Sequence, residues 1–459
     1  MVRASRCAGP IALSHALGRT LRVSAATTLL FAAIFPWNKS AAADDPETCR
    51  KAEGPISVTA CTDAITSGKF QGRDLAALYL NRGFVRSKLN NLDQAIQDYS
   101  EAIKVDPEYA VALNNRCAAY VRKGELDLAI QDCTKAISLN PTYANAYISR
   151  GNAYRQKNDS SHALSDYERA IELDKTSVAA LFGAALVYSS SENYVGALAT
   201  YNDIIKIDDK NAAALNNRGL VYLRMRDFDH AIQDFTTAIN VDPEFVFALN
   251  NRCSAYNSKN DPDNAFIDCD RAIQLDPKYP NAYVGRGRAL RIKGQLDRAI
   301  ADYDQAIKLD PKSASAFFGR AYAYDQKQEY DRSIDDYRKA AELNPNDPET
   351  WNNLCWDLAI VNQLEKALSG CNRSLLLRPN DASSLDSLGF VYLKSGNWAQ
   401  AIENYDAALK IRPKYASSLY GRGLAKQKNG DPDGGNADIN AAKEIRADIG
   451  GEFKRLGAQ

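Results

Sequence analysis

Residues 110–143 read AVALNNRCAAYVRKGELDLAIQDCTKAISLNPTY. We interpret residues 112–122 as a first helix, 123–125 as a short turn, and 127–138 as a second helix. The dipeptide Asn140-Pro141 ends the second helix, because proline lacks an amide donor and disfavours helical geometry in the residue before it. The segment therefore predicts a helical hairpin.

The same pattern returns every 34 residues along most of the chain. Steps of 34 meet proline at eight of ten positions, without insertion or deletion: Pro107, Pro141, Pro243, Pro277, Pro311, Pro345, Pro379 and Pro413, with Lys175 and Asp209 as the exceptions. A frame that starts at Ala76 gives eleven units, which end at residue 449. One hairpin cannot bury both of its faces, so the units must stack on one another.

Small and aromatic residues recur at fixed positions, which we number as places 1 to 34 from Ala76. Place 8 is Gly, Ala or Cys in all eleven units, and place 20 is Ala in nine of them. Place 24 is aromatic or Cys in ten units, with Ile439 as the exception. Small residues let two helices approach closely, and the aromatic ring fills the space beside them.

These positions resemble the motif of the tetratricopeptide repeat family. One unit carries the motif as Tyr147, Gly151, Tyr154, Ala163, Tyr167 and Ala170. The resemblance implies an all-α, right-handed superhelical solenoid of about eleven 34-residue helix-turn-helix repeats, with the first helix of each unit lining a concave groove. We expect an opening helical hairpin over 44–75, the repeat array over 76–449, and a C-terminal capping tail over 450–459.

The N-terminal segment is predicted to be a secretory leader. Four arginines precede an apolar run over 23–35: Arg3, Arg6, Arg19 and Arg22. The run is shorter than the roughly 20 helical residues that span a bilayer. Ala41-Ala42-Ala43 is a small-residue cleavage pattern. We expect a Sec-type signal peptide over 1–43, cut after Ala43, and a periplasmic or secreted mature protein without a transmembrane segment. A membrane anchor that stays attached is the alternative.

Charge and composition argue against several classes of function. The chain has 57 Lys plus Arg and 57 Asp plus Glu, and removing residues 1–43 takes away five cations and no anion, which leaves 52 − 57 = −5. This balance gives no electrostatic case for a nucleic-acid partner. His162 and His230, the two histidines beyond the leader, stand at the outer start of second helices, where histidines are usually solvated. We therefore expect no enzyme, no cofactor and no metal site.

An Arg and an Asp covary between places 7 and 23. Eight units carry both: Arg82 with Asp98, Arg116 with Asp132, Arg150 with Asp166, Arg218 with Asp234, Arg252 with Asp268, Arg286 with Asp302, Arg320 with Asp336, and Arg422 with Asp438. The three units with Ala184, Leu354 or Leu388 at place 7 lack the Asp as well. We infer an ion pair between helices, within a unit or between neighbouring units. Coincident divergence of degenerate copies is the alternative.

The cysteines also covary between two places of the repeat. Cys appears at place 8 in three units, and only in those units is place 24 also Cys. Helix axes about 8–10 Å apart, less two Cα radii of about 2.3 Å, bring facing Cα atoms near the range that a disulfide needs. The predicted disulfides are Cys117–Cys133, Cys253–Cys269 and Cys355–Cys371, with Cys49–Cys61 in the opening hairpin. Small buried thiols or a zinc site are the alternatives.

Asparagines recur on the first helices and predict a binding groove. They stand at place 6 as Asn81, Asn115, Asn217, Asn251 and Asn353, and at place 5 as Asn114, Asn216, Asn250 and Asn352. The place 6 row resembles the asparagine ladder in the repeat region of O-GlcNAc transferase, with breaks at Gly183, Gly285, Gly319 and Gly421. Carboxamides can hold an extended peptide backbone by hydrogen bonds. Places 12 and 13 add cations that include Arg122, Arg155, Arg224 and Arg291. Asparagines that only cap, pack or solvate are the alternative.

The sequence thus favours a non-catalytic scaffold or adaptor of the cell envelope. We expect it to bind extended segments of a protein or peptide partner in the groove, with self-association as a further possibility. One alternative is a binding module for anionic cell-wall or exopolysaccharide chains. Another is a regulatory partner of a separate envelope enzyme.

Overall fold

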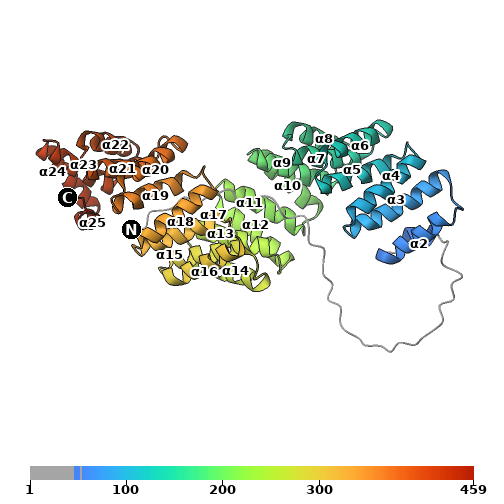
Figure 1. The fold of residues 1–459 in the computed structure, drawn as a ribbon, viewed down its shortest axis with the longest axis horizontal. Coiled ribbons are helices and arrows are strands. Elements are labelled where there is room, and N and C mark those ends of the chain that lie inside the picture. Colours follow the sequence, from blue (N-terminus) through green and yellow to red (C-terminus); the bar gives the residue numbers. More distant parts are fainter. Residues whose placement is uncertain (1–45, 52–53, 459) are drawn as a thin grey trace, which may run out of the picture. The chain divides into compact units, whose positions relative to one another are not determined.

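A computed structural model describes residues 46–51 and 54–458, so the predicted leader over 1–43 lies outside the described residues. The described residues form 25 helices and no strand (Figure 1). They divide into an N-terminal unit, 46–227, and a C-terminal unit, 228–458. Consecutive helices pack against each other within each unit, so the fold is an all-α repeat solenoid.

The N-terminal unit begins with the opening hairpin and continues with alternating first and second helices of the repeats. Its helices are α1 (Pro46–Lys51), α2 (Gly54–Thr66), α3 (Gly72–Lys88), α4 (Leu92–Val105), α5 (Ala110–Lys123), α6 (Leu126–Leu139), α7 (Ala144–Gln156), α8 (Ser160–Leu173), α9 (Val178–Ser190), α10 (Tyr194–Ile207) and α11 (Ala212–Arg224). In the unit quoted first, α5 and α6 extend one or two residues beyond the predicted helices at each end.

The C-terminal unit begins with a second helix and ends with a short additional helix. Its helices are α12 (Phe228–Val241), α13 (Val246–Ser258), α14 (Pro262–Leu275), α15 (Pro280–Ile292), α16 (Leu296–Leu309), α17 (Ala314–Gln326), α18 (Tyr330–Leu343), α19 (Pro348–Ile360), α20 (Leu364–Leu377), α21 (Ala382–Lys394), α22 (Trp398–Ile411), α23 (Ala416–Lys428), α24 (Pro432–Ile445) and α25 (Ile449–Arg455).

The turn between the two helices of each repeat depends on one left-handed residue. Place 15 has a positive φ in every repeat: Asn90, Gly124, Asn158, Glu192, Arg226, Asn260, Gly294, Gln328, Asn362, Gly396 and Gly430. This conformation costs a residue with a Cβ about 1–2 kcal/mol, and Gly and Asn tolerate it best. Eight of these eleven residues are Gly or Asn, so local backbone sterics select most of the turn residues.

The small residues mark the closest helix contacts. The Ala side chains at place 20 are fully buried, as at Ala95 and Ala163, and so are the rings of Tyr99 and Tyr167 at place 24. A Cβ added to Gly83 at place 8 would lie 2.7 Å from Cε1 of Tyr99. The glycine is therefore needed for the ring of its own repeat to pack between the helices.

A glycine at place 6 leads to a testable prediction. Replacing Gly319 by Ala should destabilise the C-terminal unit by about 1–3 kcal/mol, because the new Cβ would overlap the buried ring of Tyr303 in the preceding repeat. Gly451 in α25 is the matched control, since its nearest atom would be 3.7 Å away. Gly451→Ala should be neutral or stabilising, as expected for Gly to Ala in a helix. Urea unfolding followed by circular dichroism measures both, and equal effects would contradict the steric explanation.

The predicted arginines and aspartates join the two helices of a repeat. In seven of the eight pairs the guanidinium contacts the carboxylate, at 2.6–2.7 Å for the closest atoms: Arg82–Asp98, Arg116–Asp132, Arg150–Asp166, Arg252–Asp268, Arg286–Asp302, Arg320–Asp336 and Arg422–Asp438. The eighth pair, Arg218 with Asp234, has one member in each unit and stays a prediction. Hydrogen bonds to Asp302 raise the pKa of Arg286, so the guanidinium stays charged.

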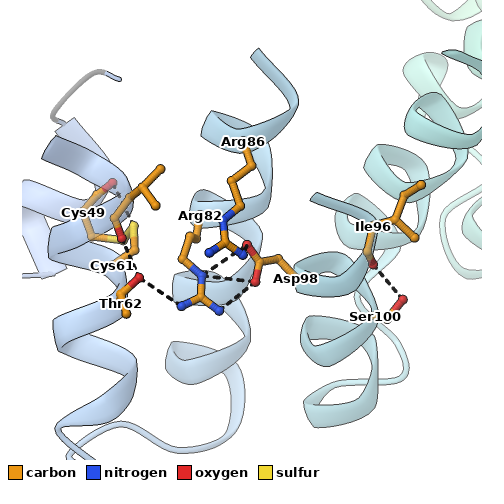
Figure 2. Close-up of polar contacts among 9 residues, drawn as sticks. Cys49, Cys61, Thr62, Arg82, Arg86, Ile96, Asp98 and Ser100 are labelled. Atoms are coloured by element: carbon orange, nitrogen blue, oxygen red, sulfur yellow. Dashed lines mark hydrogen bonds and ion pairs between the residues drawn. A yellow bond between two sulfur atoms is a disulfide. The ribbon is translucent and has the colours of Figure 1, made fainter. Parts of the chain in front are cut away.

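Each of these arginines also reaches the helix pair before its own repeat. Arg116 donates from Nη1 to Ser100 Oγ at 3.0 Å, and Arg286 donates to Asp270 Oδ1 at 2.6 Å, both at place 25 of the preceding repeat. In the first repeat Arg82 donates to Thr62 of the opening hairpin at 3.1 Å, while Arg86 adds a second cation to Asp98 (Figure 2). The arginine thus ties three helices together, two in its own repeat and one in the repeat before.

Exposed lysines form a second, weaker set of links between repeats. Each runs from place 14 to an Asp at place 18 of the preceding repeat: Lys123–Asp93, Lys157–Asp127, Lys259–Asp229, Lys293–Asp263 and Lys327–Asp297. The aspartates of these pairs are at least 75% exposed. Exposed pairs contribute about 0–1 kcal/mol, so the buried arginines dominate the polar coupling.

The structure brings together the cysteines of all four predicted pairs. The S–S distances are 2.08 Å for Cys49 and Cys61, 2.08 Å for Cys117 and Cys133, 2.10 Å for Cys253 and Cys269, and 1.96 Å for Cys355 and Cys371. The Cα atoms lie 4.6–5.6 Å apart, within the range for disulfides. All eight cysteines are buried.

Candidate peptide-binding surface

The first helices present places 5, 6, 9, 12 and 13 on one side, because side chains three and four residues apart on a helix are neighbours. We call this side, on the first helices of the repeats, the first-helix face. It contains all the asparagines and cations that the sequence singles out for binding. The structure places these residues in three different environments.

The place 5 asparagines are buried and support their neighbours. Asn114, Asn216, Asn250 and Asn352 are each 6% exposed. The Asn114 amide donates to Asn115 Oδ1 at 3.4 Å, and the Asn216 amide donates to Asn217 Oδ1 at 3.2 Å. Place 5 therefore orients place 6 in these repeats and does not itself present an amide to a ligand.

The place 6 asparagines lie at the junction with the preceding repeat. Asn81, Asn115, Asn217 and Asn353 are half-buried, and Asn251 is buried. Burial raises the pKa of Tyr201 to about 12, although Ser189 and Asn217 hydrogen-bond its hydroxyl. Asn353 has a buried Nδ2 without a hydrogen-bond partner. Many of the side-chain amide groups at place 6 therefore face the repeats.

The breaks in the row have a packing explanation. A Cβ at Gly183 or Gly319 would overlap the ring at place 24 of the preceding repeat, and a Cβ at Gly285 would overlap the sulfur of Cys269. Gly421 stands in the same relation to Tyr405. These glycines are fixed by packing between repeats.

The predicted cations at place 13 cap helices. Arg122 Nη1 donates to the carbonyl of Ser87 at 2.9 Å, and Arg224 Nη1 donates to the carbonyl of Ser189 at 3.2 Å. Both carbonyls belong to the last turn of the preceding first helix, where carbonyl groups lack helical partners and cations are favoured. The two arginines therefore stabilise the contact between repeats.

The predicted cations at place 12 lie against tyrosines. Arg291 is 9% exposed and lies 4.3 Å from the ring centroid of Tyr322. Burial raises the pKa of Tyr167, against the opposing charge and hydrogen bond of Arg155. Arg155 and Arg291 are therefore engaged within the scaffold.

An aromatic site on the C-terminal unit is absent from the sequence predictions. Trp356 of α19 and Phe390 of α21 stand at place 9 in successive repeats, with ring centroids 4.8 Å apart. Tyr420 of α23 stands at place 5, and Lys394 of α21 at place 13. The run of aromatics at place 9, Tyr322, Trp356 and Phe390, was the sequence signal for this site.

The chain's own C-terminal helix occupies this aromatic site. Phe453 of α25 is 1% exposed and lies 5.8 Å from Phe390 and 4.8 Å from Tyr420, measured between ring centroids. The Lys394 ammonium donates to the carbonyl of Leu456 at 3.2 Å and to the carbonyls of Ala359 and Ile360 at the end of α19. Burial lowers the pKa of Lys394. A peptide segment is therefore bound on the first-helix face of this unit.

Within residues 46–51 and 54–458, no helix is long and apolar enough to cross a bilayer. The same residues contain no group of three or more His, Cys, Asp or Glu side chains placed to hold a metal ion.

The fold and its surface define an α-helical repeat scaffold of stacked helix pairs. The tetratricopeptide repeat model matches residues 76–109, 110–143, 144–177, 212–245 and 314–347, a TPR repeat model matches 287–328 and 389–430, and a further tetratricopeptide repeat model matches 269–301. The chain belongs to the tetratricopeptide repeat family. Members of this family generally act as non-catalytic scaffolds for protein interactions.

The chain is similar to several solved structures. The APC/C hetero-tetramer Cut9-Hcn1 is 14% identical, with a TM-score of 0.50 over 87% of this chain and 86% of that chain. A tetratricopeptide repeat protein from Parabacteroides merdae is 22% identical, with a TM-score of 0.47 over 53% of this chain and 97% of that chain. YrrB, described as a TPR protein with an unusual peptide-binding site, is 23% identical, with a TM-score of 0.34 over 41% of this chain and 97% of that chain.

Proposed function

We propose that this protein is a non-catalytic scaffold of the cell envelope, which binds peptide segments of partner proteins on the first-helix face. The observation that carries the proposal is α25, a peptide segment bound through Phe453 to the first helices α21 and α23. The first helices of the N-terminal unit present the equivalent places. Phe84 stands there at place 9, as Phe390 does in its own repeat, and is 47% exposed.

Peptide binding is favoured over an anionic polysaccharide on one observation. Arg122, Arg224 and Lys394 donate to helix carbonyls of the preceding repeat, and Arg291 is buried against Tyr322. A polyanion needs cations that are free to pair with it, whereas a peptide needs apolar contacts and hydrogen bonds. These four cations already have partners within the scaffold, so the aromatic rings at place 9, such as Phe84 and Phe390, favour a peptide.

An envelope location is supported by the cysteines and the leader. Four buried cysteine pairs at bonding distance are typical of proteins from oxidising compartments. The basic and apolar leader with its Ala41-Ala42-Ala43 pattern agrees with export. Fractionation of the tagged chain in its native cell should place it outside the cytoplasm, with Asp44 as the first residue.

Site-specific cross-linking tests the binding surface. A photo-reactive residue at position 84, on α3, should form adducts with partner proteins in intact cells. The matched control is position 128 on α6, because Leu128 is 45% exposed but belongs to a second helix. Adducts at 84 and none at 128 would support the proposal. Equal adducts at both positions, or none at 84 with adducts at 128, would contradict it.

A further inference from the structure

The C-terminal helix leaves the path of the repeats. Phe453, Leu456 and Gly457 stand at places 4, 7 and 8 of what would be a twelfth repeat. Yet α25 has only seven residues, whereas the other first helices have 13 to 17, and Gly457 has a φ of +72°. Its aromatic partners lie on α21 and α23, and Figure 1 shows α25 beside α23.

The docking of α25 runs back across several repeats. Ile449 at its start is fully buried, and Phe453 contacts Tyr420 and then Phe390, one repeat further back. The carbonyl of Leu456 reaches Lys394, whose other partners are on α19. The segment therefore lies on the first-helix face as a bound ligand would.

The aromatic site is not completely filled. A pocket remains beside α25, lined by Gln328, Tyr330, Trp356 and Ile360 on one side and by Glu452, Arg455 and Leu456 of the tail on the other. A longer helix, or one with a larger side chain at the position of Leu456, would gain contacts there that α25 does not make.

The helix has little stability of its own. Isolated helices shorter than about 12–15 residues are marginal in water, so α25 is helical because it is docked. It is joined to α24 by residues 446–448 only, and such a short tether gives a high effective concentration at the site. A partner without the tether must bind more favourably in order to replace it.

We propose that α25 is a built-in competitor for a helix-binding site formed by Trp356, Phe390, Lys394 and Tyr420. The partner that fits this site is a short amphipathic helix of another protein, with an aromatic residue where Phe453 lies and an aliphatic residue four positions before it, where Ile449 lies. This inference rests on the proposed function. For the C-terminal unit, it specifies the chemistry of the partner and how binding of the partner is regulated.

The test uses the mature chain and a fluorescent peptide of residues 446–458 as the probe. Phe453→Ala in the protein should release the tail, so this variant should bind the peptide at least tenfold more tightly than the unmodified chain in fluorescence anisotropy. A peptide with Ala in place of Phe453 should not bind. The double variant Phe453→Ala with Phe390→Ala should lose binding of the normal peptide, because the aromatic site is gone.

Hydrogen exchange of the unmodified chain provides a second measurement that does not depend on a variant folding. The amides of α25 should exchange at least tenfold faster than those of α23, since the tail opens without its unit. Equal protection of α25 and α23 would overturn the proposal and make α25 a permanent cap. Peptide binding that is equal in the unmodified chain and the Phe453→Ala variant, or absent from a folded Phe453→Ala variant, would overturn it as well.

These outcomes are distinct from a failure of the proposed function. Cross-linking at position 84 reports on the N-terminal unit, which lacks α25. Adducts at 84 together with a permanently docked α25 would keep the scaffold and remove only the competitor.

Discussion

Replacing Arg286 by Leu should lower the free energy of unfolding of the C-terminal unit by about 3–5 kcal/mol, the usual cost of leaving a buried charge unpaired. Asp302 is 7% exposed, and it accepts two hydrogen bonds from Arg286, at 2.7 and 2.8 Å. The same arginine holds Asp270 of the preceding repeat at 2.6 Å. Both carboxylates lose this partner. Urea unfolding monitored by hydrogen exchange in α15 and α16 measures the loss.

The chain itself supplies the matched control. One repeat carries Leu388 at place 7 and Asn404 at place 23, without the ion pair. The double variant Arg286→Leu with Asp302→Asn copies places 7 and 23 of that repeat and should recover most of the stability, because Asp302, the more deeply buried of the two carboxylates, no longer carries a charge. A double variant as unstable as the single one would show that the packing of the arginine stem matters more than its charge.

An exposed ion pair gives the lower limit of the stability loss that we expect when a link between repeats is removed. Lys293→Ala removes the contact with Asp263, which is 75% exposed. This change should cost no more than about 1 kcal/mol. A comparable loss for Lys293→Ala and Arg286→Leu would contradict the distinction between buried and exposed links.

Reduction of the four cysteine pairs should destabilise both units. Three of the pairs close 16 residues of sequence and one closes 12. In the chain-entropy model, a disulfide that closes a loop of this length stabilises the folded state by about 3 kcal/mol. The thermal midpoint should therefore fall on addition of a thiol reductant. A variant without the eight cysteines should show no such response and should melt below the oxidised chain.

Alkylation in denaturant separates disulfides from free thiols. Mass spectrometry of the mature protein should find none of the eight cysteines modified before reduction and all eight modified after it. Modification of all eight before reduction would refute the pairing, and with it the strongest support for an oxidising compartment.

The architecture could be predicted from the sequence because the eleven repeats of the chain can be compared with one another. Leu at place 7 accompanies the loss of Asp at place 23, and Cys at place 8 occurs only with Cys at place 24. Such covariation within one chain points to contact, and the structure has contact in seven of the ion pairs and all four cysteine pairs. The third partner, at place 25 of the preceding repeat, varies among Ser, Thr, Asn and Asp, and Asn372 stands there even before Leu388, so this place carries no comparable covariation and was not part of the prediction.

The candidate binding site could be predicted less completely from the sequence. The repeat frame shows that Asn114 and Asn115 lie on a first helix, but a helix position does not say whether a side chain points to solvent or to the repeat before it. The structure buries Asn114 and pairs it with Asn115. It also directs Arg122 to the end of the preceding helix. These outcomes depend on contacts between repeats, which the spacing within one repeat does not specify.

The helix pairs, their length of 34 residues, the small residues at their contacts and the residues that join them could all be predicted without the structure, because each of these follows from local geometry repeated eleven times. The position of α25 could not, because it depends on contacts with other repeats. Phe453 and Leu456 have the spacing of one more repeat, but Phe453 is buried against Phe390 and Tyr420, and the carbonyl of Leu456 accepts a hydrogen bond from Lys394. These partners are far away in the sequence. A short helix has no fixed position of its own, so the surface that buries it determines its place.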